Sequence, residues 1–169
     1  MREAPAHLED DVTTTPMEEA DAAEVSRLLV SSYEFLGERE GLSPEQTRFL
    51  VSRRGSLECV RRESRSQQYL IARDAGGIVG VVAVSGDTIT KLYVSPKHTG
   101  EGIGRSLYEA AESLIRNGGH ARVALGAFPT AVPFYVRMGL SVVGHKEAAG
   151  ALEGLTVALM HKELEHGAA

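Results

Sequence analysis

Three glycines at alternate positions, between an apolar extended segment and a helical one, constrain this chain of 169 residues more than any other feature. They are Gly100, Gly102 and Gly104, in the stretch HTGEGIGRSLYEAAESL (98–114). Glycine tolerates positive φ and lets a bulky group approach the backbone. A loop of this kind at the start of a helix directs backbone N–H groups and the positive end of the helix dipole at one point. The stretch therefore predicts a phosphate-binding loop, and a flexible turn is the alternative.

The spacing disagrees with two common nucleotide-binding loops. A P-loop requires Gly-Lys-Ser/Thr, whereas Arg105 and Ser106 follow the third glycine here. A dinucleotide-binding loop has the pattern G-x-G-x-x-G, with an acidic residue about 20 positions later. This chain has G-x-G-x-G, and the segment at that distance, ARVALGAF (121–128), contains no acidic residue. Both patterns fit poorly.

Hydrophobic periodicity predicts a strand, two or three helices, three strands, and then a helix, a strand, a helix and two strands, the number depending on whether Gly55 splits the second helix. The predicted helices cover residues 21–37, 43–54, 56–66 and 130–139, with a further helix from the glycine loop to residue 117. The predicted strands cover residues 11–17, 68–74, 78–86, 88–96, 121–128, 140–145 and 154–164. For the first helix, Asp21 and Glu24 form a capping-box pattern and Gly37 predicts the end.

The connections between these segments predict the fold class. A helix joins the strands 88–96 and 121–128, and such a βαβ crossover makes them parallel. The strands 68–74 and 78–86 are separated by the turn AGG, which predicts an antiparallel hairpin. We therefore expect an α/β (α+β) fold: a mixed, mostly antiparallel sheet of six to seven strands, with a central parallel pair and helices on both faces.

The composition is typical of a soluble globular protein, and we expect one domain over residues 11–169 after a flexible N-terminus, residues 1–10. A net charge of −5 argues against general nucleic-acid binding. The single cysteine, Cys59, excludes an intramolecular disulfide and fits a reducing, cytoplasmic location. The six histidines lack metal-ligand spacing, no apolar run is long enough for a membrane, and the first residues do not form a signal peptide.

Segments on either side of one predicted strand carry a family resemblance. LYVSPKHTGEGIGRSLYEAAE (92–112) resembles the acetyl-CoA loop of the GNAT N-acetyltransferase superfamily, in which an apolar strand and a Pro precede Arg/Gln-x-x-Gly-x-Gly/Ala. AVPFYVRMGLSVVG (131–144) resembles the family segment A-x-x-F-Y-x-x-x-G-F, with Leu140 in place of Phe. IVGVVAV (78–84) is similar to the preceding family strand. The resemblance covers roughly residues 11–164.

The resemblance implies acetyl-CoA as the cofactor and assigns residues to it. Main-chain groups of Leu92, Tyr93 and Val94 would bind the pantetheine arm, because its amides can pair with an open strand edge. The strands 88–96 and 121–128 should therefore splay apart. The pyrophosphate would lie on the loop amides, which belong to Thr99, Gly100, Glu101, Gly102, Ile103, Gly104 and Arg105.

Three positions depart from the family pattern. Thr99 stands where Arg or Gln is usual, and Glu101 stands where Lys or Arg is common. Both changes remove positive charge near the phosphates, so we expect weaker cofactor binding, with compensation by Lys97 and Arg105 left open. Phe128 occupies a position where many members bind the pantetheine through Asn, so it would pack on the arm or line the acceptor site.

Tyr135 is the catalytic candidate that the resemblance implies, as the general acid that protonates the departing thiolate. A half-buried aromatic that packs the helix on the sheet is the alternative. The general base is not identified. Family members that use a Glu place it at the position of Thr88, which cannot serve. The remaining candidates are Asp87, Glu34, Tyr33, His98 and His145, or a water chain.

The expected function is an N-acetyltransferase in which a small-molecule primary amine attacks acetyl-CoA directly, in a ternary complex. A protein lysine or N-terminal acetyltransferase and a non-catalytic acyl-CoA sensor are the alternatives. Tyr33, Phe35 and Phe49 are candidates for an apolar acceptor rim. The basic segment 53–65 is either a solvated helix face or an anion site. The apolar closing strand GLTVALM (154–160) allows a homodimer.

Overall fold

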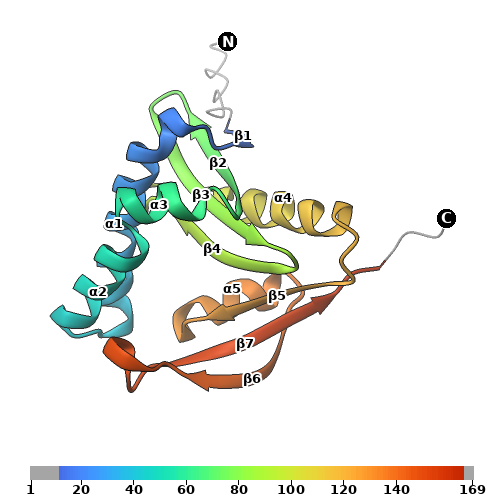
Figure 1. The fold of residues 1–169 in the computed structure, drawn as a ribbon. Helices are drawn as coiled ribbons and strands as arrows, with labels where there is room; N and C mark the ends of the chain where they lie inside the picture. Colours follow the sequence, from blue (N-terminus) through green and yellow to red (C-terminus); the bar gives the residue numbers. More distant parts are fainter. Residues whose placement is uncertain (1–11, 166–169) are drawn as a thin grey trace, which may run out of the picture.

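The computed structural model describes residues 12–165, so the predicted flexible N-terminus lies outside the described residues. Seven strands form one sheet in the order β1-β2-β3-β4-β5-β7-β6 (Figure 1). The strands are β1 (Thr13–Pro16), β2 (Gln68–Asp74), β3 (Gly77–Ser85), β4 (Thr88–Val94), β5 (Arg122–Ala127), β6 (Ser141–Glu147) and β7 (Thr156–Glu163). The helices are α1 (Ala22–Glu40), α2 (Pro44–Arg54), α3 (Leu57–Glu63), α4 (Ile103–Asn117) and α5 (Val132–Arg137).

The strand pairing confirms the predicted fold class. Every neighbouring pair is antiparallel except β4 and β5, which are parallel and are connected through α4. Figure 1 shows α1, α2 and α3 gathered beside the β2–β4 part of the sheet, while α4 lies across its other face. Within residues 12–165, no helix combines the length and the apolar character that a membrane crossing requires.

Two hydrophobic clusters, one on each face of the sheet, form the core. One joins α4 and α5 to the sheet and includes Leu107 and Tyr108, and the other joins α1 and α2 to the opposite face and includes Leu29 and Leu50. Gly80 of β3 sets the distance to α4, because a Cβ there would lie 2.7 Å from Cδ1 of Leu107. Bare backbone on the central strand thus brings α4, and with it the glycine loop, close to the sheet.

The first helix starts after Asp21 as predicted, but its end and its cap differ from the prediction. It continues through Gly37 to Glu40, and Gly41 ends it with a φ of 64°. Gly37 is required by packing instead, because a Cβ there would collide with the side chain of Thr47 on α2. The predicted capping box is also wrong: Glu24 accepts a hydrogen bond from the backbone N–H of Ile78 at 2.9 Å.

The second helix begins as predicted. The hydroxyl of Ser43 accepts from the N–H of Gln46 at 3.1 Å, and the Gln46 side chain accepts from the N–H of Ser43 at 2.9 Å. This reciprocal pair is the capping box that the sequence pattern indicates. Gly55 then separates α2 from α3, so of the two arrangements that the sequence left open this region has the one with two helices.

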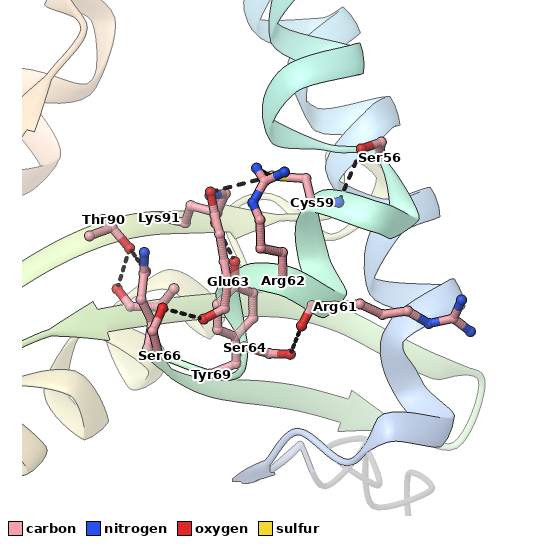
Figure 2. A network of polar contacts seen from close by, with 12 residues as sticks. Ser56, Cys59, Arg61, Arg62, Glu63, Ser64, Ser66, Tyr69, Thr90 and Lys91 are labelled. Carbon is pink, nitrogen blue, oxygen red and sulfur yellow. Dashed lines mark hydrogen bonds and ion pairs between the residues drawn. The ribbon is translucent and has the colours of Figure 1, made fainter.

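A polar network ties α3 to the sheet (Figure 2). The carboxylate of Glu63 accepts hydrogen bonds from Lys91 of β4 and from the hydroxyl of Tyr69 of β2, the latter at 2.8 Å. The thiol of Cys59 donates to the same carboxylate at 3.3 Å. Burial raises the pKa of Cys59, and its hydrogen bond to Glu63 adds to that effect, so this thiol is a packed core group rather than a nucleophile.

Candidate active site

The two parallel strands diverge, and this divergence creates the site. β4 and β5 pair at a single position, Thr88 opposite Ala124. Beyond that point each strand stays paired on its other side, β4 with β3 and β5 with β7. The facing edges toward Leu92–Val94 and Gly126–Ala127 therefore carry backbone groups without a strand partner. This is the splayed geometry that the family resemblance implies.

A cleft of about 760 Å³ lies at the open end of these strands. It is bounded by the end of β4, the glycine loop, the start of α4 and helix α5. The residues that line it are Arg39, Leu92, Val94, His98, Thr99, Gly100, Gly102, Ile103, Gly104, Arg105, Thr130, Ala131, Pro133, Phe134, Tyr135, Arg137 and Met138. A cleft of this size accommodates a large organic ligand.

The glycine loop presents the amino end of α4 to this cleft. Gly100 and Gly102 both have a φ of 82°, a conformation that side chains rarely adopt. Gly102 precedes the first helical residue, Ile103, and its carbonyl accepts the helix bond from Ser106 at 3.1 Å. The preceding N–H groups of the first turn have no intrahelical acceptor, and this turn contains no acidic residue. The arrangement suits an anion at the helix terminus.

Among residues 12–165, basic side chains line the cleft and carboxylates do not. The lining includes Arg39, Arg105 and Arg137, together with His98. Glu101 is exposed, is not part of the lining, and lies 3.0 Å from Nδ1 of His98. The acidic residue of the loop is thus held by a neighbouring imidazole at the rim.

A second cavity, of about 70 Å³, lies on the α1 side of the same opening. Leu36, from α1, closes one side, and residues of β4, of β5 and of the segment from Phe128 into α5 form the rest. Its lining comprises Leu36, Ile89, Thr90, Lys91, Leu92, Tyr93, Leu125, Gly126, Ala127, Phe128, Ala131 and Tyr135. Leu92, Ala131 and Tyr135 belong to both cavities, so the large cleft and the small cavity meet at these residues.

Tyr135 is held at this junction by other aromatic rings. The side chain is 8% exposed, and its ring lies 5.0 Å from that of Phe134 and 6.5 Å from that of Tyr108, edge to face in both cases. Burial raises the pKa of Tyr135, and the neighbouring Tyr93 raises it further. The hydroxyl therefore keeps its proton at neutral pH, as a general acid must.

Most of the sequence-predicted site residues lie around these cavities. The large cleft takes in Leu92, Val94, Tyr135 and six of the seven named loop residues, Glu101 being the exception. Tyr93 and Phe128 line the small cavity. Sequence reasoning missed Arg39, Leu36 and Arg137. Arg137 lies inside the segment PFYVRMG and could have been found there, whereas α1 reaches the site only through the tertiary fold.

The candidate bases lie elsewhere or are already engaged. Asp87 accepts a hydrogen bond from Thr88 at 2.8 Å, at the paired end of β4. Glu34 on α1 and His145 on β6 are exposed and line neither cavity. Tyr33 is 1% exposed and packs edge to face on Tyr93, with ring centroids 4.9 Å apart. It belongs to the core and not to an acceptor rim.

The structure also shows where the other residues predicted for an acceptor rim, and the basic segment predicted as an anion site, lie. Phe35 is exposed on α1 beneath the guanidinium of Arg39, 5.6 Å from the ring centroid. Phe49 is partly buried against the α1 side of the core. The basic segment 53–65 contributes no residue to either cavity. Its Arg61 pairs with Glu19 at 3.0 Å on an exposed surface.

Comparison with known proteins agrees with this geometry. The family model described as the acetyltransferase (GNAT) domain matches residues 38–164, most of the chain. A solved GCN5-related N-acetyltransferase from Rhodopseudomonas palustris is 27% identical, with a TM-score of 0.83 and coverage of 90% of this chain and 95% of that chain. No curated protein sequence matches significantly.

Two further solved structures share the fold at lower identity. One is the PaiA N-acetyltransferase from Thermoplasma acidophilum in complex with coenzyme A, with 18% identity, a TM-score of 0.73 and coverage of 91% and 99% of the two chains. The other is YncA, a putative acetyltransferase from Salmonella typhimurium with acetyl-CoA, with 18% identity, a TM-score of 0.68 and coverage of 94% and 97%.

Proposed function

The chain belongs to the GNAT acetyltransferase family, and we propose on this basis that it transfers the acetyl group of acetyl-CoA to the primary amine of a small molecule. The large cleft is the donor site and the small cavity is the acceptor site. Amine and thioester then meet at the junction that both cavities share. Binding of both substrates at once allows direct attack in a ternary complex.

The residues of the cleft fit coenzyme A. The unpaired edges of β4 and β5 offer N–H and C=O groups to an arm that itself contains amides. The loop from Thr99 to Arg105 and the amino end of α4 offer backbone N–H groups to a pyrophosphate. Arg39 and Arg137 supply positive charge where Thr99 and Glu101 do not. Phe128, in the small cavity, packs at the acceptor end.

In this proposal the chain assists the reaction in two ways: it polarises the thioester carbonyl and it donates one proton. Acetyl-CoA supplies an activated thioester carbonyl. A backbone N–H at the end of β4, near Val94, polarises that carbonyl as negative charge develops on its oxygen. The Tyr135 hydroxyl donates its proton to the sulfur that leaves. The observation that carries this assignment is that the buried Tyr135 lines both cavities.

The test removes the hydroxyl of Tyr135 and keeps its aromatic ring. Tyr135→Phe should lower kcat about 100-fold, the size of a lost general acid, while the Kd for coenzyme A stays unchanged. Tyr108→Phe is the matched control, because this ring contacts Tyr135 but lines neither cavity. Thiol release by the wild type over a panel of amines, followed by calorimetry of both variants, gives the two measurements. Equal kcat in Tyr135→Phe and the wild type would refute the role of this hydroxyl.

The same assay distinguishes the proposed acetylation of small amines from acetylation of peptides and from a non-catalytic sensor. The small volume beside Tyr135 favours a small amine over a lysine in a protein. Acetylation of peptides but not of small amines would replace the proposed acceptor. Tight binding of acyl-CoA without turnover of any amine or peptide would establish a sensor.

We further propose a single-domain cytoplasmic enzyme that forms a homodimer. The free thiol of Cys59 supports a reducing compartment. Val142, Val143 and Leu159 are exposed on the last two strands and supply apolar surface for a second copy. Sedimentation of the wild type and of Val143→Lys tests the dimer, which should dissociate in the variant.

A further inference from the structure

The side chain of Lys162, on β7, connects the end of α5 to α4. Its Nζ donates to the two carboxylate oxygens of Glu112 on α4, at 3.0 and 3.3 Å, and to the backbone carbonyl of Met138, at 3.1 Å. An ammonium group has three N–H donors, so each of them has an acceptor atom here. Met138 directly follows the last residue of α5, the helix that carries Tyr135. Lys162 therefore ties the helix of the proposed proton donor to two other elements of the fold.

Helix α5 is too short to be stable by itself. It has six residues, whereas an isolated helix of fewer than about 12 residues is marginal in water. The last carbonyl groups of a helix lack intrahelical partners, and that of Tyr135 accepts from the N–H of Leu140 at 3.0 Å. Lys162 supplies a donor for the carbonyl of Met138, and its positive charge suits the carboxyl end of a helix. Contacts from outside α5 thus hold its last turn.

The stem of Lys162 lies against bare backbone at this turn. Gly139 has a φ of 97°, and a Cβ there would lie 3.2 Å from Cε and 3.4 Å from Nζ of Lys162. The same Nζ lies 5.9 Å from the ring centroid of Tyr108, whose ring packs edge to face on Tyr135 at 6.5 Å. Lys162 therefore supports Tyr135 in two ways, through the end of its helix and through the ring that packs on it.

Glu112 connects Lys162 to the helix that begins at the glycine loop. Its side chain is 13% exposed, and it lies on α4, whose first residues line the large cleft. Arg116, also on α4, pairs with the same carboxylate at 2.8 Å. In the part of the chain that the structure describes, the side chain of Arg116 makes no polar contact with α5 or with the turn after it. Lys162 therefore fixes the end of α5 relative to the helix that presents the loop.

We propose that Lys162 is a positioning residue for acetyl transfer: it holds the hydroxyl of Tyr135 within reach of the sulfur that leaves. This proposal rests on the proposed role of Tyr135 as the proton donor. Lys162 lines neither cavity, so its effect reaches the reaction through α5 and the ring of Tyr108. Proton transfer needs the donor within hydrogen-bond distance of its acceptor, and a small displacement of a reacting group lowers the rate steeply.

The first test removes the ammonium group and keeps an apolar stem. Lys162→Met should lower kcat about tenfold, less than the loss of the Tyr135 hydroxyl, because the donor is still present but is held less well. The Kd of coenzyme A should change much less than kcat, because Lys162 does not line the cleft. The full-length enzyme is assayed by thiol release and by calorimetry.

Arg116→Met is the matched control for this variant. It also removes one cation from Glu112, but the carbonyl of Met138 keeps its donor, so kcat should stay at the wild-type value. The same kcat in Lys162→Met and in Arg116→Met would overturn the proposal. If Lys162→Met does not fold, Glu112→Gln takes its place, because it removes the anchor of Lys162 on α4. A wild-type kcat in Glu112→Gln would then count against the proposal.

A double variant tests whether Lys162 acts through Tyr135. In the Tyr135→Phe background the proton donor is already absent, so adding Lys162→Met should cause almost no further loss of kcat. Losses that multiply, to about 1,000-fold in the double variant, would show that Lys162 acts on another part of the enzyme, and the proposal would fail.

Hydrogen exchange tests the same contact without turnover. The N–H groups of Met138 and Leu140 donate to the carbonyl of Tyr135 at 3.1 and 3.0 Å. With coenzyme A bound, both should exchange several-fold faster in Lys162→Met and at the wild-type rate in Arg116→Met. Unchanged exchange in Lys162→Met would contradict the proposal. Faster exchange in a protein that acetylates no amine would support the placement of Tyr135 by Lys162 and refute the proposed function instead.

Discussion

Glu63 of α3 and Lys91 of β4 form an ion pair whose side chains are 21% and 5% exposed. Tyr69 of β2 completes the arrangement, since Tyr69 and Lys91 both pair with Ala83, from opposite sides of β3. One carboxylate thus spans three strands and holds α3 against the strand that lines both cavities. The stability of this region should depend on keeping the pair intact.

Removing the lysine alone should be costly. In Lys91→Met the carboxylate of Glu63 loses its counterion, and we expect the free energy of unfolding to fall by about 3 kcal/mol, at the lower end of the range for breaking a buried pair because Glu63 is partly exposed. Urea unfolding followed by circular dichroism measures the change.

Two controls test whether the loss of stability comes from the uncompensated charge of Glu63. The double variant Lys91→Met/Glu63→Gln should recover much of the loss, because no uncompensated charge remains. Arg48→Met removes an exposed pair with Glu45, at 73% and 75% exposure, and should leave the unfolding curve almost unchanged. If Lys91→Met and Arg48→Met behave alike, the ion pair contributes nothing specific.

Acid should weaken the fold through two carboxylates. Hydrogen bonds from Lys91 and Tyr69 outweigh the effect of burial on the pKa of Glu63, and those from Lys162 and Arg116 lower the pKa of Glu112, so both pKa values lie below 4.5. A lowered pKa means that the unfolded chain takes up protons first as the pH falls. The contribution is present above pH 4.5 and is lost below it.

Unfolding free energies measured from pH 7 down to pH 3 check the acid effect. The wild type should lose stability more steeply than Glu63→Gln in that range, because the variant has no carboxylate to protonate at this position. Parallel curves for the two proteins would mean that Glu63 has the same pKa in the folded and unfolded states.

Two glycines, Gly102 before α4 and Gly119 after it, allow a matched pair of substitutions. Gly102→Ala and Gly119→Ala each place a side chain on backbone with a φ of 82° or 85°, where no atom lies within 4 Å of the added Cβ. Each should cost about 1 kcal/mol of stability through backbone strain. Of these two glycines, only Gly102 lines the cleft.

Binding of coenzyme A should therefore separate the two variants. Displacing one N–H from a phosphate oxygen in Gly102→Ala costs about 1.5 kcal/mol, which raises the Kd roughly tenfold. Gly119→Ala should bind as tightly as the wild type by calorimetry. Equal Kd values for both variants would place the pyrophosphate outside this loop.

The acid in the loop should weaken cofactor binding slightly. Glu101→Gln removes a negative charge near the predicted phosphates, and we expect the Kd of coenzyme A to fall about two- to threefold at low salt, since an exposed charge is worth about 0.5 kcal/mol. The difference should vanish at high salt. Glu45→Gln, on α2, should have no effect, and weaker binding by Glu101→Gln would contradict the prediction.

Local pattern accounts for much of the fold. The alternation of apolar residues, the capping box of Ser43 and Gln46 and the βαβ crossover are short-range signals, and the strands they predict form the observed sheet. Gly37 shows the limit of such signals. As a sequence feature it indicates a helix end, but its role is to admit Thr47 of the next helix, and packing between helices has no local signature.

The sequence by itself determined the glycine loop, the parallel strand pair and the position of Tyr135, because each depends on residues close together in the chain. Only the tertiary structure decided what surrounds them. It brought Leu36 and Arg39 of α1 to the two cavities and left Tyr135 in the wall that both cavities share. These contacts join segments whose separation along the chain carries no periodic signal, so they arise from how helices and strands pack.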